Sequence, residues 1–258
     1  MIYMLNWVPD LRFVEAAGAQ IVPQADGTVE WVDPLATPGA AIYQWHGGFG
    51  EQQPVTGPCM PLLLPKRAYR LAGEWTATPA DAVGLAVESY SKQGVRLDRI
   101  VGDQKTLDFT LAPEDMNYAV QLVSLSATAL RFHQLVLAEA DTLAAYAIHM
   151  HARDFCVVTP REQTELPLVI QLQPKQQWIA SFVPQPAAEC VYIPTPPHCG
   201  DSATWVRKRL EALMACFGTQ RLQQAQWGAQ TRALRPYVKT MLELLDTAGD
   251  QAVDDGRR

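Results

Sequence analysis

The sequence predicts a mainly β protein, with an N-terminal β-sandwich or jelly roll followed by a smaller α/β or helical region. The first half holds short segments rich in β-branched and aromatic residues, and turn-forming residues separate them. Near the end of the second half, apolar residues recur every three or four positions, which is typical of a helix. We therefore place a β-sandwich domain at 1–138 and an α/β-helical extension at 139–258.

The expected strands of the first domain are each short enough for a sandwich, and about eight of them occur at regular spacing. Asp26-Gly27 lies between the first two and favours a tight turn, because glycine readily adopts positive φ. The expected strands are Ile21–Val22, Thr28–Val32, Ala40–Trp45, Ala68–Trp75, Val83–Tyr90, Thr106–Leu111, Tyr118–Leu125 and Leu130–Leu137.

The second half begins with Glu139–Met150, which we interpret as a short helix or linker. A proline-rich stretch separates the later strands from the helices, and it must be extended or looped because proline lacks an N–H. The expected strands are Phe155–Thr159, Leu168–Leu172, Ile179–Val183 and Val191–Ile193. The expected helices are Asp201–Phe217, Gln220–Leu234 and a third after Pro236.

Composition excludes several classes of protein. Hydrophobic residues make up 48% of the chain and charged residues 19%, which suits a folded domain. The net charge of −6 argues against a general nucleic-acid binder, which needs clustered Lys and Arg. The N-terminus lacks the basic region of a secretory signal, and we expect no membrane span. The five cysteines have no close pair spacing, which favours reduced thiols in the cytoplasm.

Several segments of the first half follow one another in a recognisable order. Asp26–Leu35 has the pattern D-G-T-V-x-aromatic-x-D-P-L, and Gly39–Trp45 has G-x-x-I-x-x-W. Further segments are Pro61–Leu71, Val87–Gly94, Pro113–Leu122 and Leu130–Leu135. In this order the first half, about residues 1–138, resembles the third, small accessory secretory protein of Gram-positive accessory Sec systems. Val87–Tyr90 is less aromatic than that family's pattern, and the second half has no counterpart in its short members.

The resemblance implies a β-sandwich like a carbohydrate-binding module and a non-enzymatic, cytoplasmic protein without a cofactor. The family's position can also be peripheral, at the inner face of the cell membrane. The implied partners are two sibling accessory proteins, one glycosyltransferase-like and one acyltransferase-like, the accessory SecA motor and a serine-rich-repeat glycoprotein client. The leading interpretation is a subunit that supports modification and export of this client.

Aromatic residues of the first half are the candidate binding residues. In Ala41–Trp45, alternation places Tyr43 and Trp45 on one face of the strand. Such rings fit a sandwich core, a protein interface, or a sugar-stacking platform. The platform belongs to the alternative interpretation, a glycan-binding module, and calls for nearby polar groups such as Gln44, Glu88 or Asn117. The candidate residues are Trp31, Tyr43, Trp45, Tyr69, Trp75 and Tyr90.

Two further motifs suggest chemistry of other kinds. Gly200-Asp201-Ser202 is similar to the nucleophile block of some lipases and esterases, but Ser202 also suits a helix cap, and the last histidine, His198, precedes it. His149, His151 and Cys156 offer zinc ligands, which Cys190 or His198-Cys199 would complete. Because no Cys-x-x-Cys pair accompanies these ligands, we expect no metal site. Because a helix cap explains Ser202 and no histidine follows it, we expect no catalytic site.

Overall fold

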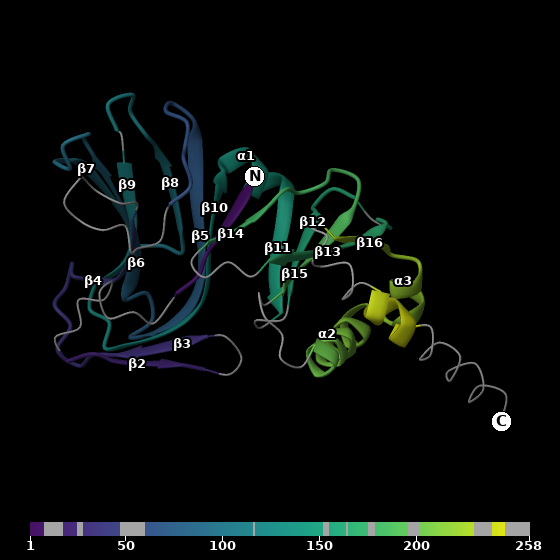
Figure 1. Ribbon diagram of the computed structural model, residues 1–258. Helices are drawn as coiled ribbons and strands as arrows, with labels where there is room; N and C mark the ends of the chain where they lie inside the picture. The colour runs from purple at the N-terminus through teal and green to yellow at the C-terminus, as the bar shows by residue number, and fades with distance from the viewer. Residues whose placement is uncertain are drawn as a thin grey trace. The chain divides into compact units, whose positions relative to one another are not determined.

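A computed structural model describes most of the chain, which forms two compact units (Figure 1). The first unit comprises Met1–Ala144 and Gln177–Val183, and the second comprises Ala145–Gln176 and Pro184–Arg258. The described residues are 1–7, 18–24, 28–46, 60–115, 117–151, 155–163, 165–174, 179–195, 202–229 and 239–245.

The larger sheet of the first unit has the strand order β14-β1-β10-β3-β2. The long strand β10 also pairs with β5, which pairs with β8, and every pairing is antiparallel. The strands are β1 (Ile2–Leu5), β2 (Gln20–Pro23), β3 (Val29–Val32), β5 (Ala68–Thr78), β8 (Thr106–Thr110), β10 (Ala129–Glu139) and β14 (Ile179–Phe182).

The smaller sheet of this unit has the antiparallel order β4-β9-β6-β7. Its strands are β4 (Ala41–His46), β6 (Val83–Tyr90), β7 (Arg96–Gly102) and β9 (Asn117–Ser124). The hairpin between β6 and β7 is closed by Gly94, whose N–H donates to the Ser91 carbonyl at 3.0 Å. Gly94 has φ 76°, a left-handed conformation that glycine accommodates without steric cost.

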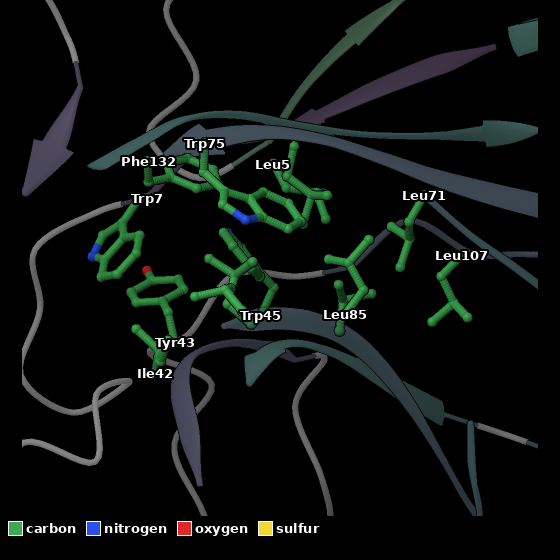
Figure 2. Close-up of a cluster of buried hydrophobic side chains, with 14 of the residues drawn as sticks. Leu5, Trp7, Ile42, Tyr43, Trp45, Leu71, Trp75, Leu85, Leu107 and Phe132 are labelled. Atoms are coloured by element: carbon green, nitrogen blue, oxygen red, sulfur yellow. The ribbon is translucent and has the colours of Figure 1, made fainter. Parts of the chain in front are cut away.

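The core of the first unit lies between the inner faces of these two sheets (Figure 2). Trp75 and Phe132 enter it from β5 and β10, and Trp45 and Leu85 enter it from β4 and β6. The ring centroids of Trp45 and Phe132 are 5.9 Å apart, so the sheets meet through aromatic contacts. The predicted β-sandwich is confirmed.

The second unit combines a mixed sheet with helices, as predicted for an α/β region. The sheet order is β11-β12-β15-β13-β16, in which β13 runs parallel to β15 and β16. Apolar residues of α2 and of the helical residues 239–245 share a core with β12, β13 and β15. The strands are β11 (Tyr146–His151), β12 (Phe155–Pro160), β13 (Leu168–Pro174), β15 (Glu189–Thr195) and β16 (Gln226–Ala229); the helices are α2 (Ser202–Phe217) and α3 (Thr219–Gln223).

The structure corrects the predicted division of the chain. The boundary expected after residue 138 falls inside β10, and the first unit continues through the short helix α1 (Ala140–Ala145) as far as Ala144. β14, expected in the second region, pairs with β1 instead. The short sequence of β14 is compatible with either sheet, so only its pairing with β1 assigns it to the first unit.

Four strands of the structure were not predicted: β1, β7, β11 and β16. β7 contains Arg96, Asp98 and Arg99, and most of its side chains are exposed. Its sequence therefore lacks the alternation of apolar and polar residues that marks a half-buried strand. β11 replaces the end of the helix or linker expected at 139–150. The helix expected at Gln220–Leu234 ends at Gln223, where the chain turns to pair with β13 as β16. Tertiary pairing overrides local propensity at these positions.

Trp45→Ala tests the aromatic core. The indole is fully buried and its Nε1 donates to the Asn6 carbonyl at 2.9 Å. Truncation leaves a cavity and an unpaired carbonyl, so we expect the free energy of unfolding to fall by about 3–5 kcal/mol. Urea denaturation of the full chain measures this. Val95→Ala, at an exposed hairpin residue, is the control and should change it by less than about 0.5 kcal/mol. Equal stability of both variants would contradict the buried position of Trp45.

The cysteines of the second unit should differ in reactivity. Burial raises the pKa of the Cys156 thiol to about 12 and also raises the pKa of Cys190. Burial raises the pKa of Cys216 too, but its side chain is exposed, so iodoacetamide should label Cys216 and spare the buried Cys156 and Cys190 until the protein is denatured. Peptide mass spectrometry reads this out, and early labelling of Cys156 would refute its burial.

The same raised pKa predicts a pH dependence of stability. The folded state favours the neutral Cys156 thiol, so this stabilisation is complete below the ordinary pKa of 9 and is lost as pH rises through about 12. We therefore expect the unfolding free energy of the wild type to fall more than that of Cys156→Ala between about pH 8 and pH 10. Urea denaturation of both proteins at both pH values measures this difference. An equal fall in the two proteins would show that the Cys156 thiol does not contribute.

Candidate functional site

Five of the six candidate aromatic residues lie in the core of the first unit and not on its surface: Trp31, Tyr43, Trp45, Tyr69 and Trp75. Figure 2 shows Tyr43, Trp45 and Trp75 between the sheets. A buried ring can neither stack on a sugar nor contact a partner protein, so the binding role expected for these five residues, at an interface or in a glycan platform, is wrong. The core alternative is the one that the structure supports.

A β-bulge refines the face assignment within β4. The register with β9 shifts between Ala41 and Tyr43, which leaves Ile42 buried together with Tyr43, although simple alternation predicts opposite faces. The Tyr43 ring lies 4.6 Å from both Trp7 and Trp45, measured between centroids. Beyond the bulge, Gln44 lies opposite Gln121 in the register with β9.

Tyr90, the sixth candidate, belongs to a polar cluster on the other face of the smaller sheet. Strand pairing assembles the cluster, because Glu88 lies opposite Arg99, Tyr90 opposite Arg96, and Gln44 opposite Gln121. We call these residues the Glu88 cluster: Gln44, Glu88, Tyr90, Arg96, Arg99 and Gln121. They come from β4, β6, β7 and β9.

Glu88 is the centre of this cluster and is only 5% exposed. Its Oε2 accepts from the Tyr90 hydroxyl at 2.5 Å and from Gln121 Nε2 at 3.1 Å. Its Oε1 accepts from Arg96 Nη1 at 3.1 Å and lies 3.4 Å from Arg99 Nε. Both carboxylate oxygens are therefore paired, which offsets the cost of burying the charge.

The remaining groups of the cluster are less fully paired. Gln121 is 5% exposed, and its Nε2 also donates to Gln44 Oε1 at 3.3 Å. Its Oε1 accepts no hydrogen bond from any residue that the structure describes. Burial, together with the hydrogen bond to Glu88, raises the pKa of Tyr90, so its hydroxyl stays protonated at neutral pH. The cluster thus presents one unused buried acceptor beside two guanidinium groups.

The sequence contained part of this site. Gln44, Glu88 and Asn117 were expected as polar companions of an aromatic surface. In the structure, Gln44 and Glu88 both accept hydrogen bonds from Gln121 Nε2, and Asn117 lies opposite Tyr90 in the strand register. Gln121, Arg96 and Arg99 were not singled out. A signal for Gln121 was present, because it is the one amide in the apolar run Tyr118–Val123.

Among the described residues, the ligands suggested for zinc do not converge, and His198 and Cys199 lie outside the described residues. Met150 lies opposite Cys156 and His151 lies opposite Phe155 in the β11–β12 pairing. Alternation therefore places the Cys156 side chain on the other face of the sheet from His149 and His151. His151 Nε2 lies 3.8 Å from Cys216 Sγ instead, and burial lowers the pKa of that histidine. The described residues hold no group of three or more His, Cys, Asp and Glu suited to a metal.

The serine motif is only partly described. Ser202 begins α2, close to the predicted helix start at Asp201. His198, Gly200 and Asp201 lie outside the described residues, as does the side chain of Ser202. None of the helices described here has the length and apolar character required to cross a bilayer.

Comparison with known proteins gives consistent matches for the first half. Residues 16–139 match the family described as the accessory Sec secretory system ASP3. The protein of that name from Streptococcus gordonii is 26% identical over 127 residues, which are 49% of this chain and 80% of the relative.

Two solved structures also match. A chain of the complex of accessory secretory proteins 1, 2 and 3 from Streptococcus pneumoniae is 24% identical, with a TM-score of 0.48, over 53% of this chain and 94% of that one. A chain of the Glycosylation Associate Protein (Gap123) complex from Streptococcus agalactiae is 16% identical, with a TM-score of 0.50, over 89% of this chain and 70% of that one. The second match extends past residue 139, so the similarity of fold is not confined to the sandwich. The resemblance predicted from the sequence is confirmed: residues 16–139 of this chain match the ASP3 family of the accessory Sec secretory system.

Proposed function

We propose that this protein is a non-enzymatic subunit of an accessory Sec export system that assembles with sibling accessory proteins. The observation that carries the proposal is the family match over residues 16–139. The likeness of fold to a chain of the Gap123 complex over 89% of this sequence supports assembly. The proposed siblings are the glycosyltransferase-like and acyltransferase-like members of the system. The accessory SecA motor, a serine-rich-repeat glycoprotein client and a cytoplasmic location complete the proposal.

The chemistry of the Glu88 cluster supports a non-enzymatic role for this face. A general base must be free to take a proton, whereas Glu88 already accepts from Tyr90, Arg96 and Gln121. The raised pKa of Tyr90 likewise disfavours its phenolate at neutral pH. The arrangement suits recognition better than proton transfer.

The surface available for assembly differs from the aromatic surface expected from sequence. Leu62 is 96% exposed in the extended segment that precedes β5, and Leu64 is also exposed. Hydrogen bonds from the Tyr118 hydroxyl to the Pro61 carbonyl, 2.8 Å, and from the Leu64 N–H to the Tyr69 hydroxyl, 2.9 Å, hold the segment. Leu63 packs against the core between the two exposed leucines. A fixed apolar side chain loses little entropy on binding, so we assign Leu62 and Leu64 to the contact with a sibling protein.

A second candidate function is recognition of glycans on the client. The observation that favours it is the Glu88 cluster, in which polar side chains from four strands converge around Tyr90. Clustered polar groups beside an aromatic ring provide the hydrogen bonds that orient a sugar. This function is compatible with assembly.

Co-purification of the full chain with its two sibling proteins tests assembly. We expect one complex by size-exclusion chromatography with light scattering, and a wild-type chain that elutes alone would overturn the proposed function. Leu62→Asp should weaken the complex by about tenfold or more, because it places a charge at a buried apolar contact. Circular dichroism and thermal unfolding check that this variant is folded.

Leu35→Asp is the matched control for this experiment. Leu35 is 88% exposed in the turn after β3, where the Asp33 N–H donates to the Thr128 carbonyl. This turn lies near the C-terminal end of β9, whereas the Leu62 segment is hydrogen-bonded to Tyr118 near its N-terminal end. We expect its complex to resemble that of the wild type. If Leu62→Asp and Leu35→Asp bound the siblings equally well, the assignment of Leu62 would fail while assembly itself stood.

A further inference from the structure

The unpaired buried amide oxygen of Gln121 has a counterpart at Gln134, so what distinguishes the Glu88 cluster is that this oxygen lies in one cluster with two guanidinium groups and the Tyr90 ring. Gln121 is 5% exposed, yet its Oε1 accepts no hydrogen bond from the described residues, while its Nε2 is held by Gln44 and Glu88. A buried acceptor without a partner costs about 1–3 kcal/mol. Native proteins keep few such groups, and a ligand that donates a hydrogen bond is one reason to keep one.

The neighbours of this acceptor define what the ligand must be. Two guanidinium groups, of Arg96 and Arg99, face one carboxylate, so the cluster carries an excess of one positive charge. A cationic donor such as an ammonium group would satisfy Gln121 Oε1 but would be repelled by this charge. A simple anion without a hydroxyl group, such as sulfate, would bind the guanidinium groups but would leave the glutamine oxygen unpaired. A neutral group that both donates and accepts satisfies both requirements.

Adjacent hydroxyl groups have this property, since each donates one hydrogen bond and accepts others. The half-buried ring of Tyr90 adds an amphipathic surface against which the apolar face of a sugar can pack. The solvent side of the cluster is formed by the side chains of Arg96 and Arg99, which are 58% and 33% exposed. Gln121 Oε1 is itself shielded from solvent, so binding requires that the Arg96 or Arg99 side chain move aside.

We propose that the Glu88 cluster is a binding site for a neutral sugar, in which a ligand hydroxyl donates to Gln121 Oε1 and neighbouring oxygens accept from Arg96 or Arg99. The proposal deepens the second candidate function by naming the face, the residues and the class of ligand. It does not rest on assembly with sibling proteins, so the two are tested separately.

Titration of the full chain with glucose, galactose and N-acetylglucosamine tests the site. Two-dimensional ¹H–¹⁵N NMR follows the Gln121 side-chain amide and the backbone of β6 and β9. We expect saturable shifts confined to these groups with at least one sugar at up to about 50 mM, because a single sugar offers few contacts and binds weakly. No saturable shift with any of the three sugars would overturn the proposal.

Gln121→Met removes the acceptor oxygen, together with the Nε2 donor to Gln44 and Glu88, while keeping the length of the side chain. We expect the sugar affinity to fall by about tenfold, as for the loss of one buried hydrogen bond. Gln134→Met is the matched control, because Gln134 also has a buried Oε1 without a described partner and donates through Nε2 to a carboxylate, that of Glu74 at 3.1 Å. Gln134 lies on β10 in the other sheet, and its variant should bind as the wild type does.

Unchanged affinity in Gln121→Met would overturn the proposal, as would tighter binding of inorganic phosphate with displacement of the sugar. If Gln121→Met did not fold, Tyr90→Phe would replace it, since it removes one hydroxyl from a half-buried position and keeps the ring. We expect about a threefold to tenfold loss of sugar affinity in that variant. Equal binding by Tyr90→Phe and the wild type would then overturn the site.

Discussion

The closure of two antiparallel sheets over a shared aromatic core is the constraint on which the rest of the first unit depends. Trp7, Tyr43, Trp45 and Phe132 contact one another from both sides of the sandwich, with centroid separations of 4.6 to 5.9 Å. Aromatic rings bury large areas and prefer a narrow set of geometries, so they fix both the register of the strands and the face that each strand turns inward.

The Glu88 cluster is a consequence of that register. Leu85 and Val87 point into the core from β6, and alternation then places Glu88 and Tyr90 on the other face. The same rule places Gln121 on the opposite face of β9 from the core residues Val120 and Leu122. A slip of one residue in either strand would expose the core and bury the carboxylate without its partners. The core and the candidate sugar site are therefore two faces of one sheet.

The second unit follows the same physics with a different result. Its sheet turns Phe155, Ile170 and Val191 toward the apolar side of α2, so one face is committed to packing. Alternation then separates Cys156 from the histidines of β11, and burial keeps its thiol protonated. The residues that appeared chemically promising in the sequence are thus divided between two sides of a sheet. The most exposed apolar side chains, Leu35 and Leu62, belong instead to the first unit.

Local patterns in the sequence are sufficient to predict the fold class, most strands of the sandwich, the helix that begins near residue 202 and the family resemblance of the first half. These features depend on periodicity, turn residues and the order of short segments. The pairing of β14 with β1, the strands β7 and β16, and the burial of the five aromatic rings became known from the three-dimensional fold. That fold also brought Glu88 to Gln121, which are 33 residues apart. Strand pairing and the choice of inner face are non-local, because they depend on which other strand lies alongside, and no local pattern contains that information.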